Sequence, residues 1–217
     1  AMDQGHDDVI NWTGGTIHGT VDADGGDIVN VFGGSVVTAP TDFVLDGARS
    51  LYVNLPTSTS ASPTTFMVLG SIINTGTLNV NPYGNLYVGT TANIRLGGNT
   101  FNMLDDTTTL TIDVIPGAAG SLSTAGDANI DGTLAASPKP GLYLDTETFR
   151  IITADSDLSN GTVSPSTPDA VNGTFDAVIG DTLLLEFSAT INPTSVDLTY
   201  KGLAFDEAVE VANRVRD

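Results

Sequence analysis

Four aspartates are the candidate carboxylates for acid–base chemistry: Asp105, Asp106, Asp113 and Asp131. A glycosidase places two carboxyl groups on either side of the bond that it cleaves. Asp105 and Asp106 are adjacent, so in a strand their side chains point to opposite faces, and only one of them can face a given substrate. Because the chain is rich in aspartate, we interpret all four as turn or outward residues rather than as a catalytic pair.

Other catalytic constellations are not indicated. The two histidines are His6, in the polar start of the chain, and His18, predicted to face outward on a strand. The sequence contains no Gly-x-Ser-x-Gly motif, the sharp turn that exposes a serine nucleophile. A polysaccharide lyase needs a basic residue beside metal and substrate, but Arg49, Arg95 and Arg150 are isolated in the sequence. The chain is therefore predicted not to be an enzyme and to have no catalytic residues.

Metal and cofactor sites are not predicted either. The segment 22–27 (DADGGD) resembles a calcium loop, but an EF-hand needs a glutamate at its twelfth position, and every glutamate here follows residue 146. The calcium-binding nonapeptide occurs in tandem, and this chain has no such tandem. The absence of cysteine excludes disulfides and thiolate sites.

Aromatic side chains offer a further alternative, a carbohydrate-binding surface, because their rings combine an apolar face with a polar edge. The candidates are Trp12, Tyr52, Tyr83, Tyr87 and Tyr143. Partial burial at the edges of the fold explains these residues more simply.

The scaffold that positions these side chains is indicated by near-repeats between residues 74 and 97. Leu78, Leu86 and Ile94 recur at eight-residue spacing, each in a short stretch that alternates apolar and polar residues. Alternation is typical of half-buried strands, and strands this short are not stable alone. Three such steps make a coil of about 24 residues, which is a solenoid period. Stacked coils align equivalent strands in parallel around a continuous apolar core.

Looser versions of the pattern recur from Gly15 to Leu134, so we predict an all-β fold, a right-handed parallel β-helix. An ordinary β-sandwich, which also has many short strands, is the alternative. The net charge of −19 argues against nucleic-acid binding, which needs a basic surface. It argues equally against docking on an anionic membrane surface.

The chain divides into four predicted regions. Residues 1–8 form a polar tail or tag, and residues 9–140 form the β-helix coils, with the Ser/Thr/Pro-rich stretch 56–65 as a projecting corner loop. The more regular, apolar strands of residues 141–201 are expected to form a cap, because the last coil of a solenoid otherwise exposes its core. Residues 202–217 carry a helical period, with acidic residues first and Arg214 and Arg216 last.

These regions together resemble the C-terminal part of an autotransporter passenger, the exported segment of type V secretion in Gram-negative bacteria. The resemblance rests on the Gly-Thr-Leu-x-Val rung at 76–80, on residues 128–134, and on the order of 149–154, 173–175 and 196–200. It implies a β-helix stalk, an autochaperone cap at about residues 141–201, and a linker helix that enters the protein's own outer-membrane barrel. It also implies a secreted or cell-surface location.

The expected function is therefore that of a structural stalk and folding module, in an adhesin or virulence-type protein. Two alternatives stay open: an adhesin surface that binds a host or glycan ligand or self-associates, and a polysaccharide-active enzyme. The residues expected to carry the folding role are the core of the cap, namely Phe149, Ile151, Phe175, Leu184, Phe187, Val196, Leu198 and Tyr200.

Overall fold

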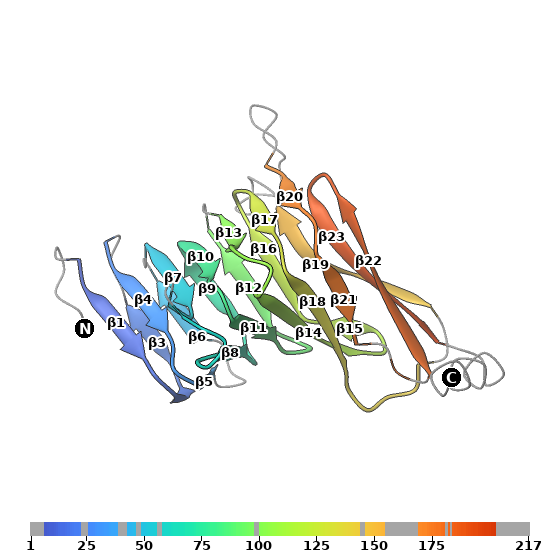
Figure 1. Cartoon of the computed structure of the whole chain (residues 1–217), viewed down its shortest axis with the longest axis horizontal. Coiled ribbons are helices and arrows are strands. Elements are labelled where there is room, and N and C mark those ends of the chain that lie inside the picture. The colour runs from blue at the N-terminus through green and yellow to red at the C-terminus, as the bar shows by residue number, and fades with distance from the viewer. Residues whose placement is uncertain are drawn as a thin grey trace.

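The computed structural model describes residues 7–22, 26–38, 43–46, 49–55, 58–97, 100–143, 146–154, 169–180, 182 and 184–202. This part of the chain is all-β, and its strands are stacked along one long axis, with β1 at one end and β22–β23 at the other (Figure 1). The strands belong to three sheets, each extending along the axis. The prediction of a parallel β-helix is confirmed.

Each sheet takes one strand from each successive coil. Sheet A contains β1 (Val9–Trp12), β4 (Ile28–Val31), β7 (Ser50–Val53), β10 (Thr77–Val80), β13 (Phe101–Met103), β17 (Ala128–Ile130) and β20 (Val171–Gly173). Sheet B contains β2 (Gly15–Ile17), β5 (Ser35–Thr38), β8 (Thr64–Val68), β11 (Gly84–Val88), β14 (Thr109–Ile115), β18 (Thr133–Pro138) and β21 (Ala177–Ile179), with β15 (Ala118–Ala119) beside β14. Sheet C contains β3 (Thr20–Asp22), β6 (Phe43–Asp46), β9 (Ile72–Thr75), β12 (Asn93–Leu96), β16 (Ser121–Thr124), β19 (Glu147–Ala154), β23 (Ser195–Gly202) and β22 (Leu185–Asn192).

The eight-residue ladder corresponds to one coil. Leu78, Leu86 and Ile94 lie on β10, β11 and β12, which belong to sheets A, B and C in turn. Each residue is fully buried, because the alternation of apolar and polar residues turns every second side chain into the space that the three sheets enclose. The eight-residue pattern therefore indicates that there are three sheets, and it also indicates which side chains of each strand face the core.

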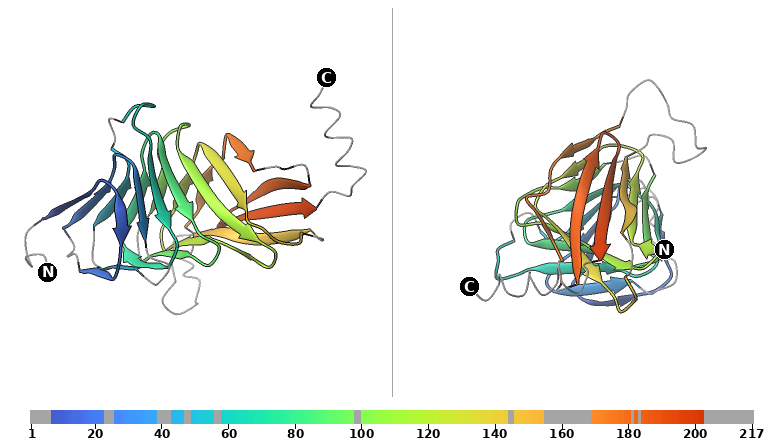
Figure 2. Two further views of the ribbon diagram at one scale, coloured as in Figure 1. Left: turned by 90° about the horizontal axis from the view of Figure 1, so that it is seen from below. Right: turned by 90° about the vertical axis from the view of Figure 1, so that its right-hand side faces the viewer.

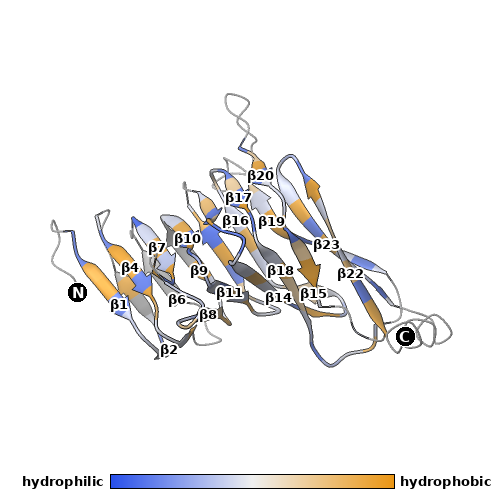
Figure 3. Cartoon of the chain, in the orientation of Figure 1, coloured by the Kyte–Doolittle hydropathy of each residue, from blue (hydrophilic) through white to orange (hydrophobic). Residues whose placement is uncertain are grey.

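The core is a set of apolar columns that run along the axis. Leu51, Leu78 and Phe101 are register neighbours on β7, β10 and β13, and none of them is exposed to solvent. Burying such a side chain stabilises the fold by about 1.5–3 kcal/mol relative to leaving it in water. Figure 3 shows the resulting alternation of apolar and polar bands along the strands. Stability therefore accumulates coil by coil through contacts between neighbours.

Coil length varies although the strand register of sheet A is continuous. Asparagines that pair across sheet A are separated by 19, 23, 27 and 43 residues in the sequence. The expected coil of about 24 residues lies within this range, and the corners absorb the differences. The corner after β17 illustrates the geometry, because Gly132 has φ +64°, and a Cβ there would lie 2.4 Å from the carbonyl oxygen of Thr108.

The C-terminal end changes strand direction. β19 is parallel to β16 but antiparallel to β23, and β22 and β23 form an antiparallel hairpin. In the right-hand view of Figure 2 this hairpin, drawn in red, lies at the near end of the stack. β20 and β21 meanwhile continue sheets A and B, so coil stacking extends beyond residue 140 into the expected cap. The predicted helical region, residues 202–217, lies outside the described residues except for Gly202, which is the last residue of β23. Residues 1–6 of the predicted tail also lie outside them.

Candidate functional site

An aromatic cluster lies where the hairpin meets the coils. Tyr200 on β23 is 1% exposed, and three rings surround it. The ring of Tyr143 meets it edge-on, with centroids 5.0 Å apart and planes at 80°. The rings of Phe149 and Phe187 lie at 6.0 and 6.3 Å. Because these side chains come from β19, β22, β23 and the segment before β19, the cluster fixes the hairpin against the last coils.

The residues expected to form the cap core divide into three groups. Five of them are buried: Ile151, Phe187, Val196, Leu198 and Tyr200. Phe149 and Phe175 are partly buried and pack against the core. The expectation for Leu184 is wrong, because this side chain is 54% exposed. Leu184 precedes β22 in a tight turn, where Thr182 and Leu185 form a bridge, so the alternation of β22 does not extend to it.

Tyr143 also links the aromatic cluster to a polar one. Its hydroxyl lies 2.8 Å from the carbonyl oxygens of Val114 and of Lys139, and it donates a hydrogen bond to this pair of acceptors. Burial raises the pKa of Tyr143, although the hydrogen bond to the Lys139 carbonyl opposes this shift. The phenol therefore stays protonated and can keep donating across the neutral pH range.

The polar cluster lies on the outer face of sheet B and joins three successive strands. Lys139 follows β18, and its ammonium group lies 2.9 Å from Oδ1 of Asp113 on β14. It donates to the hydroxyl of Tyr87 on β11 at 2.5 Å and to Oγ of Ser137 at 3.2 Å. The Tyr87 hydroxyl in turn donates to Asp113, whose side chain is only 6% exposed. The cluster ties coils together across a span of 52 residues.

The chemistry of this cluster is electrostatic rather than nucleophilic. Burial by itself lowers the pKa of Lys139, but the hydrogen bonds to Tyr87 and Asp113 and the charge of Asp113 outweigh burial and raise the pKa. The amine is therefore held as an ammonium ion and cannot act as a base toward Ser137. Asp113 is the one predicted carboxylate in this cluster, and its partners make it a structural ion-pair residue.

The other predicted carboxylates lie at the corners between sheets A and B. Asp105 accepts hydrogen bonds from the backbone and hydroxyl of Thr107, which lower its pKa. The hydrogen bond with Asp105 and the charge of Asp105 raise the pKa of Asp106, with smaller effects from Asp176 and Asp131. Asp131 accepts from the backbone of Gly132. These contacts are those of turn residues, as the sequence indicates.

Metal-ligating and basic residues are dispersed over the described chain. No group of three or more His, Asp and Glu side chains there is arranged to hold a metal ion. His18 is exposed, whereas residues 23–25 of the calcium-like segment, and His6, lie outside the described part. Arg49 precedes β7, Arg95 lies on β12 and Arg150 on β19, where it forms an ion pair with Asp197 at 3.2 Å.

The predicted aromatic surface is divided among different faces. Tyr52 and Tyr87 face outward on sheets A and B, and Tyr83 lies at a corner with φ +59°. Tyr143 belongs to the cap cluster, and Trp12 packs against the first coil's core. These rings do not form one platform.

An asparagine ladder on the outer face of sheet A was missed by the sequence reasoning. Side-chain amides donate from one coil to the preceding one, with Nδ2 to Oδ1 distances of 2.7–3.0 Å, through the pairs Asn30–Asn11, Asn102–Asn79, Asn129–Asn102 and Asn172–Asn129. On β7, the position that pairs with Asn30 on one side and Asn79 on the other is occupied by Tyr52. The signal was an asparagine between two core-facing residues of a sheet A strand, as in Val29-Asn30-Val31.

Comparisons with known proteins add no family assignment. No protein-family model matches this chain, and no curated protein is significantly similar to it. Within the part of the chain that the structure describes, no helix has the length and apolar character needed to span a membrane.

Proposed function

We propose that this chain is a non-enzymatic stalk with its own C-terminal folding cap, in the surface-exposed or secreted passenger of a Gram-negative autotransporter. One observation carries the proposal: the antiparallel β22–β23 hairpin ends sheet C over a buried aromatic cluster centred on Tyr200. Such an end removes an open parallel edge and shields the last core layer from water.

The cap is better suited than the other coils to fold first. Its strands β19, β22 and β23 have eight residues each, whereas most coil strands have three to five. The hairpin is also a local contact, because β22 and β23 are joined by a short turn, and local contacts form faster than distant ones. Each preceding coil needs a formed neighbour on which to bury its apolar side chains. Folding from the cap would therefore draw the exported chain outward.

The stalk role is supported by regular stacking without a reactive centre in the described residues. The titratable groups at Asp113–Lys139 and at Asp105–Asp106 are each explained by hydrogen bonds within the fold. The protein's own outer-membrane barrel would be its partner, and the reading frame after Asp217 should then encode strands of about ten alternating residues. A stop codon or an unrelated soluble module at that place contradicts the export proposal.

The cap role can be tested by surface display of the natural gene product in a Gram-negative host. Leu198→Asp introduces a charge at a fully buried position on β23 and should abolish display. Thr199→Asp is the matched control, because Thr199 is next in the strand and faces the other way, beside Thr148. External protease accessibility measures display. Equal display of the two variants would exclude the cap role.

The order of folding gives a second test that does not depend on export. In refolding with pulsed hydrogen exchange, the amides of β19, β22 and β23 should be protected before those of β4 and β7. Simultaneous protection, or earlier protection of β4 and β7, would contradict folding from the cap.

A further inference from the structure

The corner between β7 and β8 differs from the equivalent corner of the next coil. Residues 54–63 connect β7 to β8, whereas only residues 81–83 connect β10 to β11. The longer connection begins at Asn54, a non-glycine residue with φ +71° whose side chain is 1% exposed. A buried residue in the left-handed region requires compensating contacts from its surroundings.

Asn54 obtains these contacts by fastening the loop to the coils. Its Nδ2 donates to the carbonyl oxygen of Pro82 at 2.7 Å, and its Oδ1 accepts from the hydroxyls of Ser58 and Thr64 at 2.8 and 3.0 Å. The Ser58 hydroxyl also accepts from the backbone N–H of Leu55, and Ser62 N–H donates to the carbonyl of Thr59. The described residues of this loop are therefore held in turns by these hydrogen bonds.

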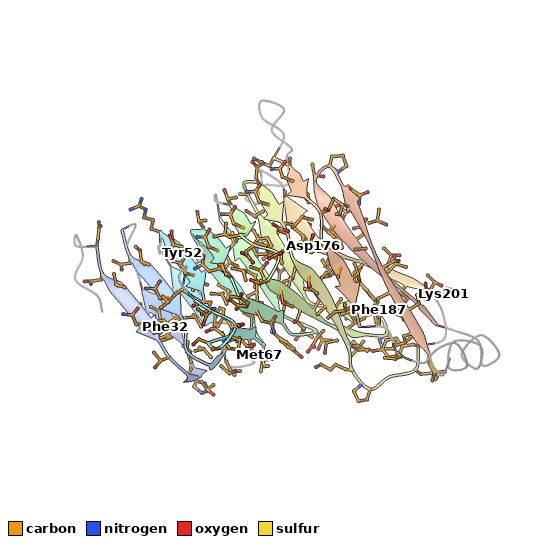
Figure 4. The ribbon with its side chains drawn as sticks, viewed as in Figure 1. Phe32, Tyr52, Met67, Asp176, Phe187 and Lys201 are labelled. Atoms are coloured by element: carbon orange, nitrogen blue, oxygen red, sulfur yellow. The ribbon has the colours of Figure 1, made fainter. Side chains whose placement is uncertain are left out.

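The loop and the preceding coil form an open, solvent-accessible pocket of about 280 Å³. Its lining consists of Phe32, Gly33, Asn54, Leu55, Ser58, Thr59 and Ser62. Phe32 stands at the end of β4, where it is labelled in Figure 4, and its ring is half-buried. Thr59 and Ser62 are exposed on the loop, and their hydroxyls can turn toward a bound molecule.

We propose that this pocket binds a single uncharged sugar ring, free or at the end of a glycan. A pyranose has an apolar face that stacks on an aromatic ring and a rim of hydroxyls that pair with side-chain hydroxyls and amides. The pocket supplies one aromatic ring in Phe32, an apolar contact in Leu55 and hydroxyls in Thr59 and Ser62. Its volume is close to the lower end of ligand pockets, about 300 Å³, which suits one ring rather than a larger molecule.

Charge restricts the ligand class. None of the seven lining residues is ionisable, so the pocket offers no cation for a phosphate or carboxylate and no carboxylate for a metal or amine. The chain as a whole carries a net charge of −19, and its field repels anions. An uncharged, hydroxyl-rich ligand is the class that this lining and this field favour together.

Phe32 has a structural counterpart in another coil, which can serve as a control position. Phe32 and Leu104 occupy the same corner of sheet A, because the N–H of each donates to the carbonyl of the residue that ends the neighbouring strand, Trp12 for Phe32 and Val80 for Leu104. Leu104 is 52% exposed and belongs to a coil without the long loop. Leu104→Ala therefore reproduces the loss of an apolar corner residue without touching the pocket.

The test is titration of the folded chain with the methyl glycosides of glucose, galactose, mannose and N-acetylglucosamine, followed by amide NMR shifts. We expect millimolar binding of at least one glycoside, with amide shifts confined to the seven residues that line the pocket. Phe32→Ala should weaken binding roughly tenfold, and Leu104→Ala should not change it. Thr59→Val, an isosteric change at an exposed position, should weaken binding severalfold and keeps the test valid if Phe32→Ala unfolds.

Three outcomes would overturn the proposal. The first is an absence of shifts with all four glycosides at millimolar concentration. The second is shifts that survive both Phe32→Ala and Thr59→Val, because binding would then lie elsewhere. The third is equal binding of methyl glucoside and of methyl glucuronide, its 6-carboxylate, because an uncharged lining in an acidic protein should reject the anion.

Discussion

The ring of Tyr143 meets the ring of Tyr200 edge-on, while the hydroxyl of the same Tyr143 lies 2.8 Å from the carbonyl oxygen of Lys139. One side chain thus joins the aromatic core of the hairpin to the residue whose ammonium group contacts Tyr87 and Asp113. The cap and the outer face of sheet B are therefore mechanically connected. Disturbing either cluster should affect the other.

Tyr200→Ala should lower the free energy of unfolding by about 3–5 kcal/mol, because it removes a large buried ring that three other rings contact. Urea unfolding followed by far-UV circular dichroism measures the change. Ile191→Ala on the same hairpin, where the side chain is 37% exposed, should cost less than about 1 kcal/mol. Similar losses for both variants would show that the ring cluster does not stabilise the end of the stack.

Asn102→Ala should destabilise the fold by about 1–3 kcal/mol, because it removes two ladder hydrogen bonds and leaves Asn79 and Asn129 without those partners. Asn11→Ala removes one bond at the exposed end of the ladder and should cost less. Thermal unfolding of both variants provides the comparison. If the terminal variant loses as much as the central one, the ladder does not act through its hydrogen bonds.

Gly132→Ala should destabilise the protein more than Gly117→Ala does. Both glycines have positive φ, +64° and +84°, so alanine incurs the left-handed penalty of about 1–2 kcal/mol at each. Only at Gly132 does a Cβ also meet backbone, 2.4 Å from the Thr108 carbonyl oxygen, which adds about 1–3 kcal/mol. Unfolding free energies of the two variants that agree within error would show that the corner relaxes freely.

Stability should fall at alkaline pH through Lys139 and Tyr143. Both groups have a pKa above the ordinary value, 10.5 for lysine and 10.0 for tyrosine, so each binds its proton more tightly in the folded state. Their contribution is complete below those values and is lost as the pH rises through the raised pKa. Between about pH 8 and about pH 12, the urea concentration at the midpoint of unfolding should fall less steeply for the double variant Lys139→Met, Tyr143→Phe than for the wild type. A double variant that follows the wild-type curve contradicts this assignment.

The fold could be predicted because its signal is local and repeated. Leu78, Leu86 and Ile94 define the direction of the core at each strand of a coil, and no distant contact has to be known. Leu184 was misplaced because apolar character alone does not show where a strand begins, and the turn at Thr182 shifts that point to Leu185.

The polar clusters could be predicted only in part. Tyr87 and Asp113 are 26 residues apart, close to one coil, so the period could have paired them. Lys139 follows Pro138 at the end of β18, and alternation does not determine where a side chain beyond a strand end points. The pocket at Phe32 depends on the left-handed conformation of Asn54, which asparagine permits but does not require.

The unequal sequence separations along sheet A mean that chain length and stack length are independent quantities. Between 19 and 43 residues separate asparagines that are neighbours in space, and the strands on either side keep their pairing. Peptide tags or whole modules inserted at corners would therefore be presented on the outside at fixed intervals along the axis. The segment inserted at one corner can therefore be exchanged without changing the position of the next corner along the axis.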